Sequence, residues 1–559
     1  MEWWRGAVIY QIYPRSFLDS NGDGIGDLPG IAERLPYIAS LGVDAIWISP
    51  FFTSPMEDFG YDISNYRGVD PIFGTLTDFD RLLAQAHELG LKIIIDMVLS
   101  HTSHRHPWFL DSRRSRDNPK SDWYVWADAR RDGSAPNNWL SMFGGPAWQW
   151  EPRREQYYLH NFLPGQPDLN VHNKAVQAAL LEECRFWLER GVDGFRLDAC
   201  NFLTHDRKLR NNPPRPAGAP PTDGVRPSNP YNRQMHVFDK SRPETLPFLR
   251  RLRALAREFG EVALLAEIAD DNSLKVMEEY AGPGAPLHSA YCFALLGPQL
   301  DTQYLPDAFQ AFHNGRHHGW PSWAFSNHDV ARAVTRWGGE AAPADYAKIL
   351  IALLGSLRGT VFIYQGEELA LPEATVPFER LRDPFGLNFY PEFRGRDGCR
   401  TPMPWDAELP HAGFSTAEPW LPVAPEHLPL AVSLQETDPK SVLNFTRGFL
   451  RWRRGHPTLI TGDIAFIATE PGLVAFERRS DQERLLVVCA LTGDGFRLRL
   501  PAPVEREFSL PGLPAGRLEG DELDMPRYGF YVARLAAATD AATPTTSDTS
   551  ATREPSHVG

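Results

Sequence analysis

The sequence predicts an α/β fold: a (β/α)8 TIM barrel with a loop-rich subdomain inserted after the third strand and an antiparallel β-domain at the C-terminal end. Short, continuously apolar runs alternate with amphipathic stretches over most of the 559 residues. Apolar strands in repeated βα units are typical of a parallel sheet that is buried on both faces. Eight such units favour a closed barrel over an open, doubly wound sheet.

The strands and helices of the predicted barrel follow from these patterns. The eight predicted strands cover residues 7–13, 42–50, 92–98, 194–199, 262–267, 291–296, 323–327 and 361–365. Apolar residues at helical spacing, followed by a glycine, predict helices over 78–89 and 176–188.

The spacing between the strands is uneven, and the surplus residues predict the domain boundaries. A βα unit takes about 30 residues, yet the third and fourth strands are about three times farther apart. The predicted parts are barrel residues 1–101 and 172–462, an inserted subdomain over 102–171, irregular excursions over 204–245 and 371–421, a β-domain over 463–535, and a disordered Ala/Thr/Ser-rich tail over 536–559.

Charge and residue patterns exclude several classes of protein. The balance of 57 basic against 71 acidic residues gives a formal net charge of −14, which argues against nucleic-acid binding. No apolar run approaches the roughly 18 residues of a membrane span, so we expect no membrane partner. Five scattered cysteines without a CxxC pair, in a chain with no visible signal peptide, predict reduced thiols in a cytoplasmic protein.

An acidic, glycine-rich segment after the first strand predicts a metal site. Side-chain oxygens of Asp19, Asn21, Asp23 and Asp27, together with the carbonyl of Ile25, would offer five ligands to one hard cation. This spacing resembles the first half of a calcium loop, but it lacks the closing glutamate and the flanking helices of an EF-hand. We expect structural Ca²⁺, with Mg²⁺ as a second option; the alternative is a polar loop with Asx-turns.

Three acidic residues stand at the ends of predicted strands. Asp198 and Glu267 end apolar runs in the fourth and fifth strands, and Asp329 follows the seventh; in a barrel these strand ends meet at the active-site mouth. Any one of them alone could be a structural loop residue. Two flanking carboxylates, however, are what glycosidic bond cleavage requires.

The neighbours of Asp198 and Glu267 suggest which of the two is the nucleophile and which is the acid/base. Arg196 precedes Asp198 by two residues on the same strand face, where it would hold that aspartate ionised as a nucleophile. Glu267 ends a more apolar strand, which fits a raised pKa and an acid/base role.

Five motifs in order give the chain a family resemblance. These motifs are 96–101 (DMVLSH), 166–170 (QPDLN), 194–198 (GFRLD), Glu267 with its strand, and 327–329 (NHD). The chain resembles the α-amylase family of glycoside hydrolases, family 13, in its α-glucosidase and oligo-1,6-glucosidase branch. The resemblance covers residues 3–535, and the metal loop matches this branch as well.

The resemblance implies a role for each matching residue. It makes Asp198 the nucleophile, Glu267 the general acid/base, and Asp329 the aspartate that grips the sugar hydroxyls. The residues that it implies bind the sugar are Asp58, Tyr61, His101, Phe162, Arg196, His328 and Arg400.

Specificity is expected from the two ends of the sugar site. An Asp58–Arg400 pair would close the far end after one glucose unit, which favours an exo-acting enzyme on small oligosaccharides. Ala199 follows the nucleophile, and in the resembling branch Ala or Thr accompanies α-1,4 cleavage whereas Val accompanies α-1,6 cleavage. A retaining mechanism, which passes through a glycosyl-enzyme, also permits glucosyl transfer to alcohol acceptors. Residues 213–230 and 382–393 would contact these acceptors.

Alternatives within the class are an oligo-1,6-glucosidase, a sucrose isomerase and a trehalose-forming enzyme. A non-catalytic scaffold of the same family would carry a membrane span and lack one of the three carboxylates.

Overall fold

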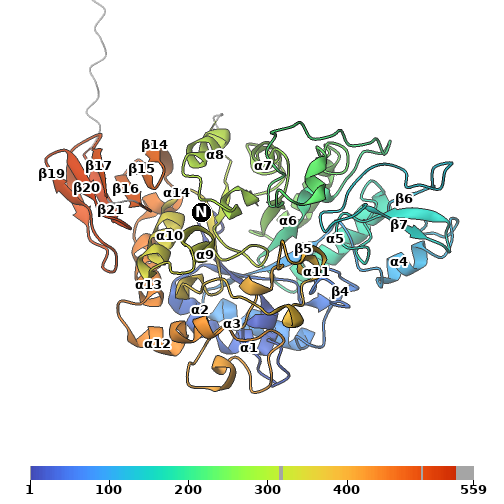
Figure 1. Ribbon diagram of the computed structural model, residues 1–559, viewed down its shortest axis with the longest axis horizontal. Helices are drawn as coiled ribbons and strands as arrows, with labels where there is room; N and C mark the ends of the chain where they lie inside the picture. Colours follow the sequence, from blue (N-terminus) through green and yellow to red (C-terminus); the bar gives the residue numbers. More distant parts are fainter. Residues whose placement is uncertain (1, 314–318, 493–494, 537–559) are drawn as a thin grey trace, which may run out of the picture.

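The computed structural model describes residues 2–313, 319–492 and 495–536, and the predicted tail lies outside them from residue 537 onward. Eight parallel strands form a barrel surrounded by helices (Figure 1), which confirms the predicted fold class. In chain order they are β1(Val8–Ile12), β2(Ala45–Ile48), β5(Lys92–Val98), β9(Gly194–Asp198), β10(Ala263–Ile268), β11(Ser289–Cys292), β12(Ser322–Ala324) and β13(Thr360–Tyr364).

The barrel closes between its sixth and seventh strands. Seven of the eight neighbouring pairs form regular parallel ladders, in the order β11-β10-β9-β5-β2-β1-β13-β12. The last gap, between β11 and β12, is spanned by one bridge from Ala290 to Pro321 and by a 2.6 Å hydrogen bond between the hydroxyls of Ser289 and Ser322.

The predicted sixth strand is shifted in sequence. Residues 291–296 were expected to form it, but β11 ends at Cys292 and Phe293–Leu296 forms a 3₁₀ turn. The apolar run continues past the strand because Leu295 and Leu296 are buried at the barrel mouth and Phe293 lines the cavity there.

Capped amphipathic helices cover the barrel. The helix α3(Leu76–Glu88) starts at a capping box between Thr75 and Asp78 and buries Phe79 and Leu82 against the sheet. The helix α5(Lys174–Glu189) is capped by Asn173. The other helices are α1(Leu28–Glu33), α2(Leu35–Leu41), α6(Thr245–Arg257), α7(Ser273–Ala281), α8(Tyr304–His313), α9(Ala333–Gly338), α10(Ala344–Ser356), α12(Val432–Thr437), α13(Val442–Arg454) and α14(Pro457–Thr461).

Long excursions leave the carboxyl ends of the barrel strands. A two-stranded ribbon of β3(Phe52–Thr53) and β4(Asn65–Val69) follows β2. The excursion between β5 and β9 holds α4(Pro107–Ser112) and an antiparallel sheet of β6(Trp126–Ala127), β8(Gln156–Leu159) and β7(Trp148–Glu151). A bridge between His101 and Asp168 ties its start to its end. The excursion after β13 carries α11(Pro384–Phe389).

The C-terminal strands form the predicted antiparallel β-domain, which lies at the opposite end of the molecule from the inserted sheet (Figure 1). One sheet has the order β14-β15-β16-β21-β18 and the other β17-β20-β19. Their strands are β14(Asp463–Glu470), β15(Leu473–Arg479), β16(Arg484–Ala490), β17(Phe496–Arg499), β18(Val504–Phe508), β19(Arg517–Glu519), β20(Glu522–Met525) and β21(Phe530–Leu535).

The five cysteines all lie in described segments, where each is buried and unpaired. Within the described ranges, no helix combines the length and the apolar character needed to cross a membrane.

Candidate active site

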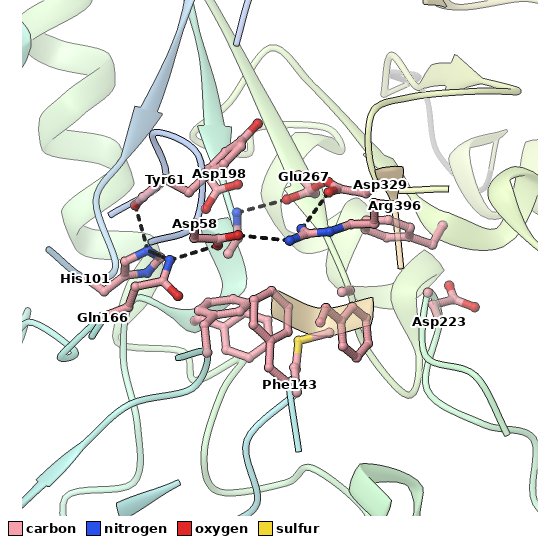
Figure 2. A pocket seen from close by; sticks show the side chains of 18 residues that line it. Asp58, Tyr61, His101, Phe143, Gln166, Asp198, Asp223, Glu267, Asp329 and Arg396 are labelled. Carbon is pink, nitrogen blue, oxygen red and sulfur yellow. Dashed lines mark hydrogen bonds and ion pairs between the residues drawn. The ribbon is translucent and has the colours of Figure 1, made fainter. Parts of the chain in front are cut away.

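A cavity opens at the carboxyl ends of the barrel strands. Figure 2 shows the carboxylates of Asp58, Asp198, Glu267 and Asp329 together above a group of aromatic rings that includes Phe143. The cavity therefore has one polar wall and one apolar wall. The apolar wall consists of Met142, Phe143, Phe162, Ala199, Phe202, Ala269, Phe293 and Phe385.

Arg196 is the centre of the polar wall. It lies on β9 and is fully buried; its Nη1 donates to Asp198 Oδ1 at 2.7 Å and to Asp96 Oδ1 at 2.9 Å. Its Nη2 forms an ion pair with Glu267 Oε1. One guanidinium thus holds the carboxyl groups of two neighbouring strands close together.

Burial dominates the protonation of these carboxyl groups. It raises the pKa of Glu267 to about 7, although Arg196 lowers it and Asp198 raises it further. It also raises the pKa of Asp198 to about 7, against the pull of Arg196. Arg196 lowers the pKa of Asp198, as expected, but its single charge is shared among Asp96, Asp198 and Glu267, so burial still raises that pKa.

Asp329 has the opposite environment. Burial alone would raise its pKa, but His328, Arg396 and Arg400 lower it well below the usual value of an aspartate. Arg396 and Arg400 donate to the same oxygen, Oδ1, at 2.9 and 3.0 Å. Asp329 is consequently ionised and fixed in orientation.

The predicted Asp58–Arg400 pair is not formed. Arg396 takes its place, since its Nη2 lies 2.9 Å from Asp58 Oδ1 and 2.8 Å from Asp383 Oδ1. Arg400 instead donates to Asp329 and, through Nε, to the carbonyl of His328 at 2.7 Å. The two arginines are four residues apart, and only the folding of residues 382–396 decides which of them reaches Asp58.

The two predicted histidines occupy different depths. His101 lines the cavity; burial lowers its pKa to about 4, so it is neutral. His328 is fully buried behind the wall, where its Nε2 is 2.6 Å from the hydroxyl of Tyr61 and the two rings stack. Tyr61 and Phe162 line the cavity as expected, whereas Arg196, His328 and Arg400 support its polar wall from behind.

Ala199 connects the two proton-bearing groups. It adopts a left-handed conformation with φ 41° and ψ 44°, directly after Asp198. In this conformation its N–H donates to Glu267 Oε2 at 3.2 Å. The side chain of Ala199 faces the apolar wall with Phe202 and Ala269.

Sequence reasoning missed three residues that line the cavity as polar groups. Arg396 lies four residues before Arg400 in the irregular excursion after β13, and nothing local shows which of the two arginines reaches Asp58. Gln166 lies in a quoted motif, and its Nε2 donates to Asp58 Oδ2 at 3.0 Å. Asp223 comes from the proline-rich excursion and gives no local signal.

The acidic loop after β1 is held by its own hydrogen bonds. Asp19 accepts from the N–H groups of Asn21, Gly22 and Gly24 and from the hydroxyl of Ser415. Asp27 caps α1 through the N–H of Gly30 and accepts from Ser20.

This loop offers the oxygen donors that Ca²⁺ takes, but its two buried carboxylates face backbone N–H groups. Nowhere in the part of the chain that the structure describes do three acidic, histidine or cysteine side chains converge as in a metal centre. The cation stays a prediction.

Known proteins resemble the chain over almost its whole length. The family model described as "Alpha amylase, catalytic domain" matches residues 11–462. A probable α-glucosidase of Rhizobium meliloti is 55% identical over 96% of this chain and 97% of its own. An oligo-1,6-glucosidase of Heyndrickxia coagulans is 36% identical over 88% of this chain and 92% of its own.

Solved structures agree with these relatives. The crystal structure of an α-glucosyl transfer enzyme, 55% identical, covers 96% of this chain and 100% of its own with a TM-score of 0.94. A trehalose-6-phosphate hydrolase of Bacillus licheniformis, 30% identical, covers the same shares with a TM-score of 0.85. The chain therefore belongs to the α-amylase family of glycoside hydrolases.

Proposed function

We propose that the protein is a retaining, exo-acting α-glucosidase that removes terminal α-1,4-linked glucose from maltose and short oligosaccharides. The observation that carries the proposal is the Arg196 guanidinium, which binds Asp198 through one nitrogen and Glu267 through the other. Two carboxyl groups within reach of one guanidinium favour the separation of about 5 Å found in retaining enzymes over the wider spacing of inverting enzymes. Relatives named α-glucosidase and oligo-1,6-glucosidase support the substrate class.

The donor site is built for one sugar ring. Asp329 is ionised and held by two arginines through Oδ1. Its Oδ2, which lies 3.3 Å from His328 Nε2, would accept hydrogen bonds from sugar hydroxyls. Behind it, the Arg396 ion pair with Asp58 and the Gln166 bond to the same aspartate close the polar end of the cavity. A closed end admits only a chain terminus, which is the basis for exo action.

The reaction proceeds in two displacements at the anomeric carbon. In the first, a carboxylate oxygen of Asp198 attacks this carbon while Glu267 donates its proton to the departing glycosidic oxygen. In the second, Glu267 removes a proton from a water molecule, which attacks the same carbon and releases Asp198. Because each displacement inverts the configuration, the product is α-glucose.

Replacement of either carboxyl group tests this mechanism. Asp198→Asn and Glu267→Gln should each lower maltose hydrolysis by at least about a thousandfold, because each group has a role that no neighbour can fill. Circular dichroism melts serve as the folding control. Proton NMR during the first turnovers should show α-glucose; β-glucose as the initial product would contradict the double displacement.

We further propose that the small side chain of Ala199 sets the linkage preference. It lies on the apolar wall beside the nucleophile, where the second sugar must pass. Wild type should therefore cleave maltose better than isomaltose, and Ala199→Val should lower maltose turnover more than isomaltose turnover. One pocket group of this size changes a relative barrier by roughly 1–3 kcal/mol.

The outcome is read as the ratio of kcat/KM for the two disaccharides. An unchanged ratio in the valine variant, or a wild type that prefers isomaltose, would assign the linkage preference to the loops instead. Ala199→Gly is the matched control, because it keeps the left-handed backbone and adds no bulk.

Alcohols are proposed as second acceptors of the glucosyl group. The apolar wall includes the stacked rings of Phe143 and Phe385, 4.8 Å apart, and offers few polar partners to a second sugar. A relative named an α-glucosyl transfer enzyme supports this activity. Maltose hydrolysed in the presence of an excess of a simple alcohol should give an alkyl α-glucoside, detected by mass spectrometry.

A further inference from the structure

Asn201 joins the carboxyl ends of the two strands that carry the catalytic pair. It is fully buried in the 3₁₀ turn Cys200–Phe202, directly beyond β9. Its Nδ2 donates to the carbonyl of Ala269 at 2.9 Å, and its Oδ1 accepts from the N–H of Ala269 at 3.3 Å. One side-chain amide therefore satisfies both backbone groups of a residue that lies two positions after Glu267.

This contact extends the sheet where its own ladder stops. The last residue pair between β9 and β10 joins Leu197 to Ala266, one residue before each catalytic carboxylate. Beyond that pair the Asn201 amide supplies two further hydrogen bonds, between the turn after β9 and the end of β10. Ser241, from the long excursion, completes the arrangement by accepting from Nδ2 at 2.9 Å.

The same turn fixes the donor that faces Glu267. Ala199 sits in a left-handed conformation that alanine adopts only when the surrounding structure imposes it. The turn is closed by a 2.9 Å hydrogen bond from the N–H of Phe202 to the carbonyl of Ala199. With the turn held in this way, the N–H of Ala199 points at Glu267 Oε2, while Oε1 is taken by Arg196 and Tyr291.

We propose that Asn201 is a positioning residue: by clamping Ala269 to the turn after Asp198, it fixes the carboxyl group of Glu267 toward the glycosidic oxygen. The inference rests on the proposed function, in which Glu267 is the proton donor. Arg196 still pairs with both carboxyl groups without this clamp. The turn after Asp198, however, loses its two amide hydrogen bonds to Ala269, so the Glu267 carboxyl group is held less precisely.

The experiment compares two substrates that differ in their need for an acid. Maltose has a poor leaving group that must be protonated, whereas the nitrophenolate of 4-nitrophenyl α-glucoside departs without a proton. Asn201→Ala should lower kcat/KM about tenfold or more for maltose and less than about threefold for the nitrophenyl glucoside, since general acid catalysis serves only the first. Equal losses on both substrates, or none, would overturn the proposal.

A second readout is the alkaline limb of the pH profile. The N–H of Ala199 favours the ionised form of Glu267, so its displacement should move the alkaline limb of kcat/KM for maltose to higher pH. A limb that stays in place in Asn201→Ala would count against the positioning role, because a general loss of stability does not move it.

Matched variants separate positioning from folding. Thr204→Val removes a buried 2.7 Å hydroxyl hydrogen bond to Thr245 in the same segment, and it should leave the ratio of the two substrates at the wild-type value. If Asn201→Ala does not fold, Ser241→Ala removes one partner of the amide and should give a smaller shift in the same direction. No shift in that variant would then refute the proposal.

The two proposals can fail separately. If Asp198→Asn and Glu267→Gln retain maltose hydrolysis, the proposed function fails. If those variants are inactive and Asn201→Ala loses both substrates equally, only the positioning role fails.

Discussion

At the scale of single residues, burial and one arginine act in opposite directions on the protonation of the catalytic pair. Burial raises the pKa of both Asp198 and Glu267 to about 7, and Arg196 contacts both groups. The raised pKa of Glu267 favours its protonated form near neutral pH, which the first displacement needs, while Arg196 favours the ionised form of Asp198.

The pKa shifts of Glu267 and Asp198 predict how kcat/KM depends on pH. As the pH rises above about 7, Glu267 loses its proton and kcat/KM for maltose should fall by about tenfold per pH unit. As the pH falls, Asp198 gains a proton and the rate should fall as well. Stopped assays of kcat/KM over the neutral range should give a bell-shaped curve; a rate that is flat on the alkaline side would contradict the acid role of Glu267.

Some residues of the site could be predicted from the sequence and others could not. Asp198, Glu267 and Asp329 could be predicted because they lie at or just beyond the carboxyl ends of barrel strands, where the barrel topology brings them together. Arg396 and Asp223 could not, because both come from irregular excursions whose path depends on tertiary contacts. The wrong partner for Asp58 has the same cause.

At the scale of elements, the excursion over residues 204–245 docks on the end of β10 and contributes Asp223 and Gly224 to the cavity wall, on the side where we propose that the acceptor binds. Lys240 donates to the carbonyl of Ala269 at 2.9 Å, and the N–H of Asp223 donates to the carbonyl of Asp270 at 3.2 Å. This docking brings Gly224 against the ring of Phe293. The positions of the barrel strands, by contrast, could be predicted from apolar runs, but their lengths could not: the run over 42–50 forms only β2(Ala45–Ile48), and the run after Cys292 continues into the cavity wall.

Gly224 tests the docking of this excursion. Its φ is +76°, and an added Cβ would lie 2.8 Å from Phe293 Cγ. Gly224→Ala should push the segment away from the ring, raise KM for maltose about tenfold and cost about 1–3 kcal/mol of stability. Measurements of KM and of the melting temperature check both effects.

Gly218 provides the matched control in the same excursion. Its φ is +80°, but nothing lies within 4 Å of an added Cβ. Gly218→Ala should show the backbone cost of about 1 kcal/mol without any change in KM. Equal changes in KM for both variants would mean that the Gly224–Phe293 contact does not shape the acceptor region.

At the scale of the whole molecule, the acidic loop after β1 fastens the beginning of the barrel to the excursion after β13. Asp19 accepts from the hydroxyl of Ser415 at 2.5 Å, and the N–H of Trp420 donates to the carbonyl of Gly24 at 3.0 Å. A cation bound here would therefore stabilise a contact between distant parts of the chain and would lie apart from the catalytic carboxylates.

Structural calcium is predicted to change the global stability of the protein, which the melting temperature measures. A ligand that binds only the folded state stabilises it by about 2.7 kcal/mol at a hundredfold excess over Kd. Chelator should thus lower the melting temperature of wild type and calcium should restore it, with little change in maltose hydrolysis at room temperature.

Asp23→Ala is the most specific variant, since the Asp23 side chain accepts a hydrogen bond only from the N–H of Ile25 and lies outside the hydrogen bonds of Asp19. It should abolish the response to calcium, while Asp19→Ala should destabilise the protein with or without the ion. If wild type and Asp23→Ala melt alike in chelator and in calcium, the hydrogen bonds of Asp19 and Asp27 hold the loop without a metal, as the Asx-turn alternative has it.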